Sequence, residues 1–275
     1  IKPRYYTITD QAMLQDLPVY LKAGVPSVVY VVTNTGYDNW ANDGTDASWQ
    51  KFKQLEQLKK QTLPTAFPLR SIDKVSIPMA GASGQVEVTT GITVTVPVTR
   101  MYAKLKVKVE MRKAEMELNN VNVRQIPNIC RVETLAGDGK GEPMEPVPFP
   151  DETTFSSIAF AASDLEKNED KEWAVFYVPE NLQGETQTQG GNKSDAAPSN
   201  ALVVDITTEI GGERYLYAAY PGGNSLNNFN IQRNQVYRIT VTITGEKNQN
   251  NPSANCFVVK PDGFLSFEPY YRVET

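Results

Sequence analysis

The chain has 275 residues, of which 40% are hydrophobic and 21% are charged. These fractions are typical of globular proteins, so the chain is expected to bury a core. The formal net charge of −5 lacks the basic excess of nucleic-acid-binding proteins, so we expect no nucleic-acid partner.

The sequence contains no histidine, which excludes several classes of chemistry. Serine and cysteine nucleophiles activated by histidine are excluded, and so are metal sites built on imidazole. The two cysteines, Cys130 and Cys256, are too few for a four-cysteine zinc site and do not form a CxxC pair. Two small buried thiols are the preferred interpretation, and a disulfide in an oxidising compartment is the alternative. We therefore expect no metal, no cofactor and no enzyme activity.

Two features concern the location of the chain. No run of about 18 apolar residues is present, so we expect no transmembrane span. The chain begins at Ile1 without a methionine, which suggests a processed or trimmed front and leaves the compartment open.

Alternation of apolar and polar residues dominates the first half and predicts β-strands. Pro97 lies inside one of them and places it at an edge or a bulge, because proline has no N–H for the ladder. An amphipathic helix is expected at 47–60, where large apolar residues recur every three positions. The strands are expected at 26–36, at 84–100 as two strands around Gly91, at 101–111 and at 118–128.

The strand 101–111 is the most regular of these. Its odd positions are apolar and its even positions are mostly lysine, so its two faces differ in character. We expect Leu105, Val107 and Val109 to face the core, because a shift of one residue would bring three lysines inward.

The second half repeats this style and completes an all-β fold. Gly211 and Gly212 are expected to turn one strand into the next, and Pro261-Asp262-Gly263 is expected to turn a C-terminal hairpin over 254–271. Alternating strands punctuated by Gly, Pro and Asn predict antiparallel sheets packed as β-sandwiches. Further strands are expected at 171–182, 200–210, 213–224 and 234–245, with long loops at 136–152 and 184–200.

The segments TRMYAKLKVKV and NQVYRITVTI share a plan, in which a tyrosine is followed by a base and then by alternation. This similarity predicts two tandem domains of similar build. We expect an N-terminal β-sandwich over 1–128 and a C-terminal β-sandwich over 129–275, with one short helix.

Three polar segments carry residues that some sites use, and each is better explained as a loop or a turn. The charged run 164–172 mixes acids with bases, which is typical of a solvated loop rather than of a paired-carboxylate site. The segment 37–46 has oxygen ligands near a glycine, but its spacing does not match that of a calcium loop. The glycine pair in 219–225 is not followed by the lysine of a phosphate-binding loop.

Tyrosines of the second half raise a different hypothesis, a surface-exposed glycan-binding β-sandwich lipoprotein. Tyr270 and Tyr271, with Tyr215, Tyr217 and Tyr220, can form a stacking platform for sugars. Tyrosine at alternate positions of a strand is more often part of a half-buried core, so glycan binding is the alternative function.

Several phrases occur in one order along nearly the whole chain. They are LKAGVPSVVYVVTNTG, VSIPMAG, TRMYAKLKVKVE and NVNVRQIPN in the first half, and FYVPENLQG, YPGGN, FNIQRNQVYRITVTITG and NCFVVKP in the second. Together they resemble the fimbrillin-like family of the Bacteroidales, the subunits of type V pili.

The resemblance implies two β-sandwich domains of transthyretin-like build, export as a lipoprotein, and a place at the cell surface, either outer-membrane-associated or fimbrial. It also implies trimming by a trypsin-like protease, which removes an N-terminal strand and opens a groove for a strand from a neighbouring subunit. An unpaired sheet edge is a physical template for such strand addition. The family's opening phrase before RYYTITD is missing here, as is a lipid-bearing cysteine near residue 1, and Arg4 is a candidate processing site.

The main hypothesis is therefore a structural or accessory subunit of a cell-surface pilus, assembled by donor-strand exchange and serving adhesion. Its expected partners are other pilus subunits and ligands on host or bacterial surfaces. Leu105, Val107 and Val109 are expected to line the strand groove. The candidate donor segment is the C-terminal hairpin, with Phe257, Val259, Leu265 and Phe267.

Overall fold

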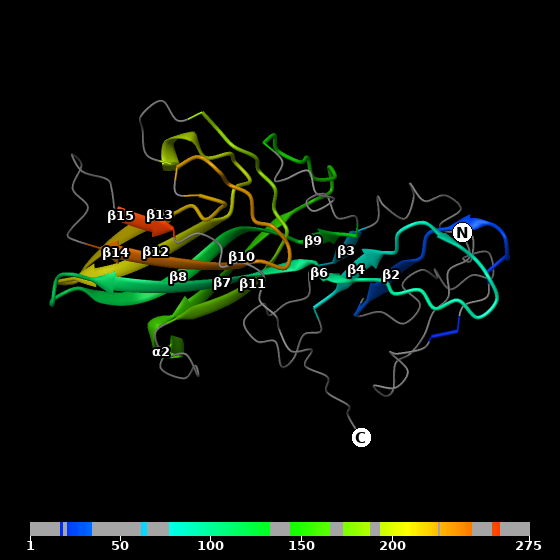
Figure 1. The fold of residues 1–275 in the computed structure, drawn as a ribbon. Helices are drawn as coiled ribbons and strands as arrows, with labels where there is room; N and C mark the ends of the chain where they lie inside the picture. Colours follow the sequence, from blue (N-terminus) through cyan, green and yellow to red (C-terminus); the bar gives the residue numbers. More distant parts are fainter. Residues whose placement is uncertain are drawn as a thin grey trace, which may run out of the picture.

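The computed structural model describes residues 17–18, 21–34, 62–64, 77–132, 144–165, 173–187, 193–224, 226–243 and 255–258. These residues form a β-sandwich with a smaller sheet region at one end (Figure 1). We call this region, which comprises residues 21–34 and 77–100, the N-terminal lobe. Strands dominate both parts, which confirms the all-β fold class.

Two four-stranded sheets form the sandwich. The strands of the first sheet are, in order, β10 (Phe155–Ala161), β8 (Glu117–Pro127), β12 (Val203–Ile210) and β13 (Glu213–Ala219). The strands of the second sheet are, in order, β11 (Ala174–Pro179), β7 (Tyr102–Met111), β14 (Val236–Ile243) and β15 (Asn255–Val258). All neighbours in the first sheet are antiparallel. In the second sheet β7 is antiparallel to β11 but parallel to β14.

The core lies between the two sheets. Leu105 and Val107 of β7 are 0% and 1% exposed, whereas the alternating lysines Lys104, Lys106 and Lys108 are half-buried on the outer face. The rings of Phe160 in β10 and Phe176 in β11 meet edge to face between the sheets, with centroids 5.5 Å apart. Each such apolar side chain stabilises the fold by about 1.5–3 kcal/mol through its removal from water. The odd residues of β7 therefore face the core.

Both sheets combine strands from the two sides of the boundary expected between residues 128 and 129. β7 and β8 precede this boundary, whereas their neighbours β10, β11, β12 and β14 follow it, so the boundary does not separate the strands of this sandwich. The two segments with a common plan lie side by side, because β7 and β14 pair in parallel register. Period-two alternation does not distinguish neighbouring places in one sheet from equivalent places in two domains.

The N-terminal lobe is built from short strands. One sheet consists of β2 (Tyr30–Thr33), β4 (Met79–Ala82) and β6 (Thr99–Arg100), and a further pair joins β1 (Pro26–Ser27) to β5 (Val86–Glu87). Outside the lobe, β3 (Thr62–Pro64) pairs with β9 (Ile129–Arg131). A single residue, Met101, separates β6 from β7. One run of chain therefore links the lobe to the centre of the sandwich.

The turn at Gly211 and Gly212, the helices and Cys130 are also addressed by the sequence. Gly211 and Gly212, both with positive φ, form the expected turn between β12 and β13. The described helices are the short α2 (Ala162–Leu165) and the 3₁₀ turn η4 (Lys193–Ala196), and neither has the length or apolar character to cross a membrane. The helix expected at 47–60 lies outside the described residues. Cys130 is buried, with 1% of its surface exposed.

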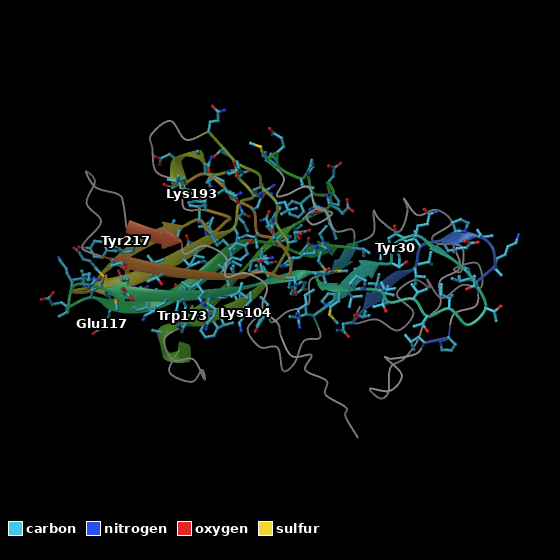
Figure 2. All side chains as sticks on the ribbon, viewed as in Figure 1. Tyr30, Lys104, Glu117, Trp173, Lys193 and Tyr217 are labelled. Carbon is cyan, nitrogen blue, oxygen red and sulfur yellow. The ribbon has the colours of Figure 1, made fainter. Side chains whose placement is uncertain are left out.

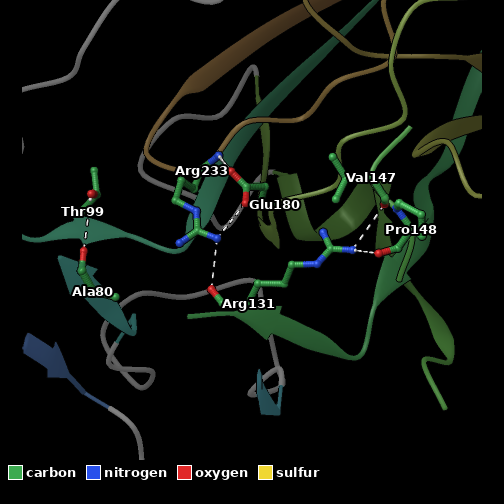
Figure 3. A network of polar contacts seen from close by, with 7 residues as sticks. All are labelled: Ala80, Thr99, Arg131, Val147, Pro148, Glu180 and Arg233. Atoms are coloured by element: carbon green, nitrogen blue, oxygen red, sulfur yellow. Dashed lines mark hydrogen bonds and ion pairs between the residues drawn. The ribbon is translucent and has the colours of Figure 1, made fainter. Parts of the chain in front are cut away.

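A buried ion pair fixes the end of β11 to the loop before β14 (Figure 3). Arg233 Nη2 donates to Glu180 Oε2 at 2.7 Å, and the two side chains are 2% and 1% exposed. The same Nη2 donates to the backbone carbonyl of Arg131 at 3.0 Å, which adds β9 to the network. Burial lowers the pKa of the Arg131 guanidinium, while the nearby Glu180 acts in the opposite direction. The Glu180 N–H donates to the carbonyl of Met101 at 3.2 Å, so the network lies where the lobe joins the sandwich.

Candidate strand-accepting edge of the N-terminal lobe

Segment 92–98 leads into β6 without joining a strand pair. Its sequence, ITVTVPV, alternates as β7 does and predicts a strand. The structure shows no strand over these residues, so that prediction is wrong. The register of β4 and β6, continued, would bring Pro97 opposite Ala82. Pro97 has no N–H to donate, which explains why the ladder ends at β6.

The apolar side chains of segment 92–98 are not buried. Ile92 and Val98 are 43% and 37% exposed, and Val94 and Val96 are half-buried. In β7, by contrast, the same alternation brings side chains fully into the core. Segment 92–98 thus has the pattern of a sandwich strand without the burial of one.

The outer edge of β2 is also open within the described part of the chain. β2 pairs there with β4 alone. The Ser83 N–H donates to the carbonyl of Val29 at 2.8 Å, which fixes the phase of the antiparallel ladder. In this phase the backbone N–H and C=O groups of Tyr30 and Val32 point away from β4. No other strand of the described part of the chain pairs with them.

More large apolar side chains are exposed around β2. Tyr30 is 37% exposed and lies in the lobe, away from the sandwich (Figure 2). Leu21, Val25 and Val28 precede β2 and are 45%, 40% and 42% exposed. We call these residues, together with β2 and segment 92–98, the N-terminal edge. β2 lies on one side of β4, and β6, into which segment 92–98 leads, lies on the other. Exposed apolar groups gathered in one region indicate a protein–protein contact.

Gly81 marks the closest approach of segment 92–98 to β4. A Cβ at Gly81 would lie 1.9 Å from the carbonyl oxygen of Pro97, so we expect Gly81→Ala to displace the segment and destabilise the lobe by about 1–3 kcal/mol. Gly84→Ala is the matched control, because a Cβ there meets no atom within 4 Å. Thermal melting checks this prediction, and equal melting temperatures for the two variants would contradict the close approach.

The residues expected to line a strand groove lie in the sandwich instead of the lobe. Leu105 and Val107 are buried in the centre of β7, and Val109 is partly buried against the same core. From Lys104 to Val107, both edges of β7 are already paired, with β11 on one side and β14 on the other. Alternation indicates which way a side chain faces but not which strand lies beside it. The open edge of β2 has no sequence signal of its own.

The other residues singled out from the sequence are only partly described. Phe257 lies in β15, which pairs in antiparallel register with β14 of the same chain. Tyr217 is 3% exposed and belongs to the core, so it cannot stack on a sugar. Six residues lie outside the described part: Arg4, Val259, Leu265, Phe267, Tyr270 and Tyr271.

The described residues provide little for small-molecule chemistry. They contain no group of three or more Cys, Asp or Glu side chains that could hold a metal ion. The cavity beside Lys104 and Tyr177 has a volume of about 10 Å³, which is room for about one water molecule.

One family model and several solved structures are similar to this chain. Residues 176–241 match the family described as Domain of unknown function (DUF4906). No curated protein matches the chain. A putative cell adhesion protein from Parabacteroides distasonis is similar in structure, with 13% sequence identity, a TM-score of 0.50, and coverage of 86% of this chain and 74% of that chain.

Two fimbrial proteins of Porphyromonas gingivalis are similar at lower scores. The fimbrilin FimA has 15% identity and a TM-score of 0.48, and the match covers 84% of this chain and 78% of that chain. The tip fimbrial protein Mfa3 has 17% identity and a TM-score of 0.44, and the match covers 69% of this chain and 68% of that chain. The match to the Parabacteroides distasonis protein shows that the chain has the fold of a putative cell adhesion protein, and the fimbrillin-like resemblance of its sequence fits that fold.

Proposed function

We propose that this chain is a structural or accessory subunit of a cell-surface pilus, which joins its neighbours by donor-strand exchange and serves adhesion. Segment 92–98, an alternating apolar segment outside any strand pair, carries the proposal. The fold supports it, since a protein of similar fold is described as a putative cell adhesion protein. In this proposal the chain is exported as a lipoprotein, resides at the outer membrane or in the fimbria, and binds other pilus subunits and surface ligands.

An incoming strand gains from the N-terminal edge in two ways. Each new backbone hydrogen bond contributes about 0.5–1.5 kcal/mol net. A strand that lies along segment 92–98 also covers its apolar side chains, at about 25 cal/mol for each Å² removed from water. These gains oppose the entropy lost on association.

The charge pattern of the N-terminal edge supports the same proposal. Exposed sheet edges in natural proteins are usually protected by charged residues, because an unprotected edge aggregates. Residues 88–99 contain no charged side chain. The absence of this protection is explained if a partner strand covers the segment in the assembled state.

Immunogold electron microscopy of producing cells, with antibody raised against this chain, tests the pilus role. Gold along filaments would identify a shaft subunit, and gold at filament ends would identify a tip or anchor subunit. Gold spread over the cell surface without filaments would contradict the pilus role and favour the glycan-binding alternative.

Val96→Lys is expected to abolish incorporation into filaments, because it places a charge on the apolar face that a partner strand has to cover. Val96 is half-buried, so we expect the monomer to remain folded. Thr95→Lys is the matched control, since Thr95 is exposed on the alternate face. Filament yield and monomer melting are measured for both variants. Normal incorporation of a folded Val96→Lys subunit would contradict strand addition at this segment.

A further inference from the structure

We infer that the sandwich is a mechanical clamp for force delivered at the N-terminal edge, an inference that rests on the proposed function. Segment 92–98 leads directly into β6, and Met101 alone separates β6 from β7. A partner strand bound to segment 92–98 therefore pulls on β7 through a continuous run of chain. β7 lies inside its sheet, between β11 and β14.

The parallel pairing of β7 with β14 gives this pull a particular geometry. Eight register pairs join the two strands, from Lys104 with Val236 to Met111 with Ile243. Backbone hydrogen bonds close both ends of the ladder, from Lys104 N–H to the Gln235 carbonyl and from Arg112 N–H to the Ile243 carbonyl, each at 2.9 Å. Because the strands are parallel, both begin at the end of the sandwich that meets the lobe.

The direction of the load decides how this ladder responds. A force that pulls the start of β7 against the far end of β14 loads all of the ladder's hydrogen bonds together, in shear. A force between the starts of the two strands would open the same bonds one after another. β11 adds six antiparallel register pairs on the other side of β7, so β7 cannot slide without breaking both ladders.

Contacts at the junction hold β7 in place where the force enters. Met101 is 0% exposed, and its N–H donates to the carbonyl of Pro78 at 2.9 Å. Asn234, which precedes β14, donates its backbone N–H to the carbonyl of Tyr102 at 2.8 Å. Arg100 Nη1 donates to Asn234 Oδ1 at 3.3 Å. β6, in contrast, has two register pairs with β4, so the lobe's sheet should yield before the clamp.

Single-molecule force spectroscopy on the full chain tests the clamp with two pulling geometries. Handles are attached at Thr95→Cys with Thr242→Cys for shear, and at Thr95→Cys with Gln235→Cys for opening bond by bond. Both variants also carry Cys130→Ala and Cys256→Ala, and the melting temperature of each is compared with that of the parent protein before pulling. Thr93→Cys with Thr242→Cys repeats the shear geometry from another exposed position and replaces the first pair if Thr95→Cys melts abnormally.

We expect a several-fold higher rupture force in the shear geometry at every pulling speed. Equal rupture forces in the two geometries would overturn the clamp. The experiment uses monomers, so the clamp can fail while strand addition stands. Conversely, normal filament incorporation of Val96→Lys would contradict strand addition, and this result is independent of the rupture force measured on a monomer.

Discussion

Val107→Lys is expected to prevent the sandwich from folding. Val107 is 1% exposed in the second sheet, with Ala174 of β11 on one side and Ile239 of β14 on the other. The substitution loses about 1.5–3 kcal/mol of apolar burial and places an ammonium group where its desolvation costs several kcal/mol more. These losses approach the whole stability of a typical domain, about 5–15 kcal/mol. Circular dichroism on heating should show no cooperative transition.

Lys108→Ala is the matched control on the opposite face of the same strand. Lys108 pairs with Glu110 at 3.7 Å, and both side chains are partly exposed, at 29% and 39%. Ion pairs of this kind contribute about 0–1 kcal/mol, so the control should melt close to the parent. A Val107→Lys variant that melts normally would show that the inward face of β7 is wrongly assigned.

Glu180→Ala is expected to lower the free energy of unfolding by about 3–5 kcal/mol, because it leaves the Arg233 guanidinium buried without its carboxylate. The ion pair joins two side chains that are almost fully buried, at 2% and 1% exposure. Urea denaturation measures the change. The double substitution Glu180→Leu with Arg233→Met should recover much of the loss, since it removes both buried charges together.

Arg214→Ala is the control for this second prediction. Arg214 pairs with Glu209 at 3.4 Å on the surface, and the Arg214 side chain is 74% exposed. Its removal should change the free energy of unfolding by less than about 1 kcal/mol. Equal effects of Glu180→Ala and Arg214→Ala would mean that the buried network contributes little to the fold.

The parts of the fold that depend on local pattern could be predicted from the sequence. The facing of Leu105 and Val107 follows from alternation, because successive side chains of a strand point to opposite faces. The turn at Gly211 and Gly212 follows from the freedom of glycine to adopt positive φ. The pairing of β7 with β14 could not be predicted, because it joins residues more than a hundred positions apart and leaves no local pattern.

In the candidate site, too, the local pattern could be predicted from the sequence and the pairing of strands could not. Alternation identified segment 92–98 as strand-like, and Pro97 indicated an edge or a bulge. That the segment pairs with no strand depends on the register of β4 and β6, which no local signal specifies. The burial of Glu180 and Arg233 was equally hidden, because each is a single charged residue in a mixed segment and its burial depends on the loops that pack around it.

Hydrogen exchange with mass spectrometry tests strand addition at the N-terminal edge most directly. The backbone N–H groups of residues 92–96 and 98, and of Tyr30 and Val32, are compared between the free monomer and fimbriae sheared from producing cells. We expect fast exchange of these amides in the monomer and strong protection in the fimbriae, with β7 protected in both. Equally fast exchange in monomer and fimbriae would contradict strand addition at this edge.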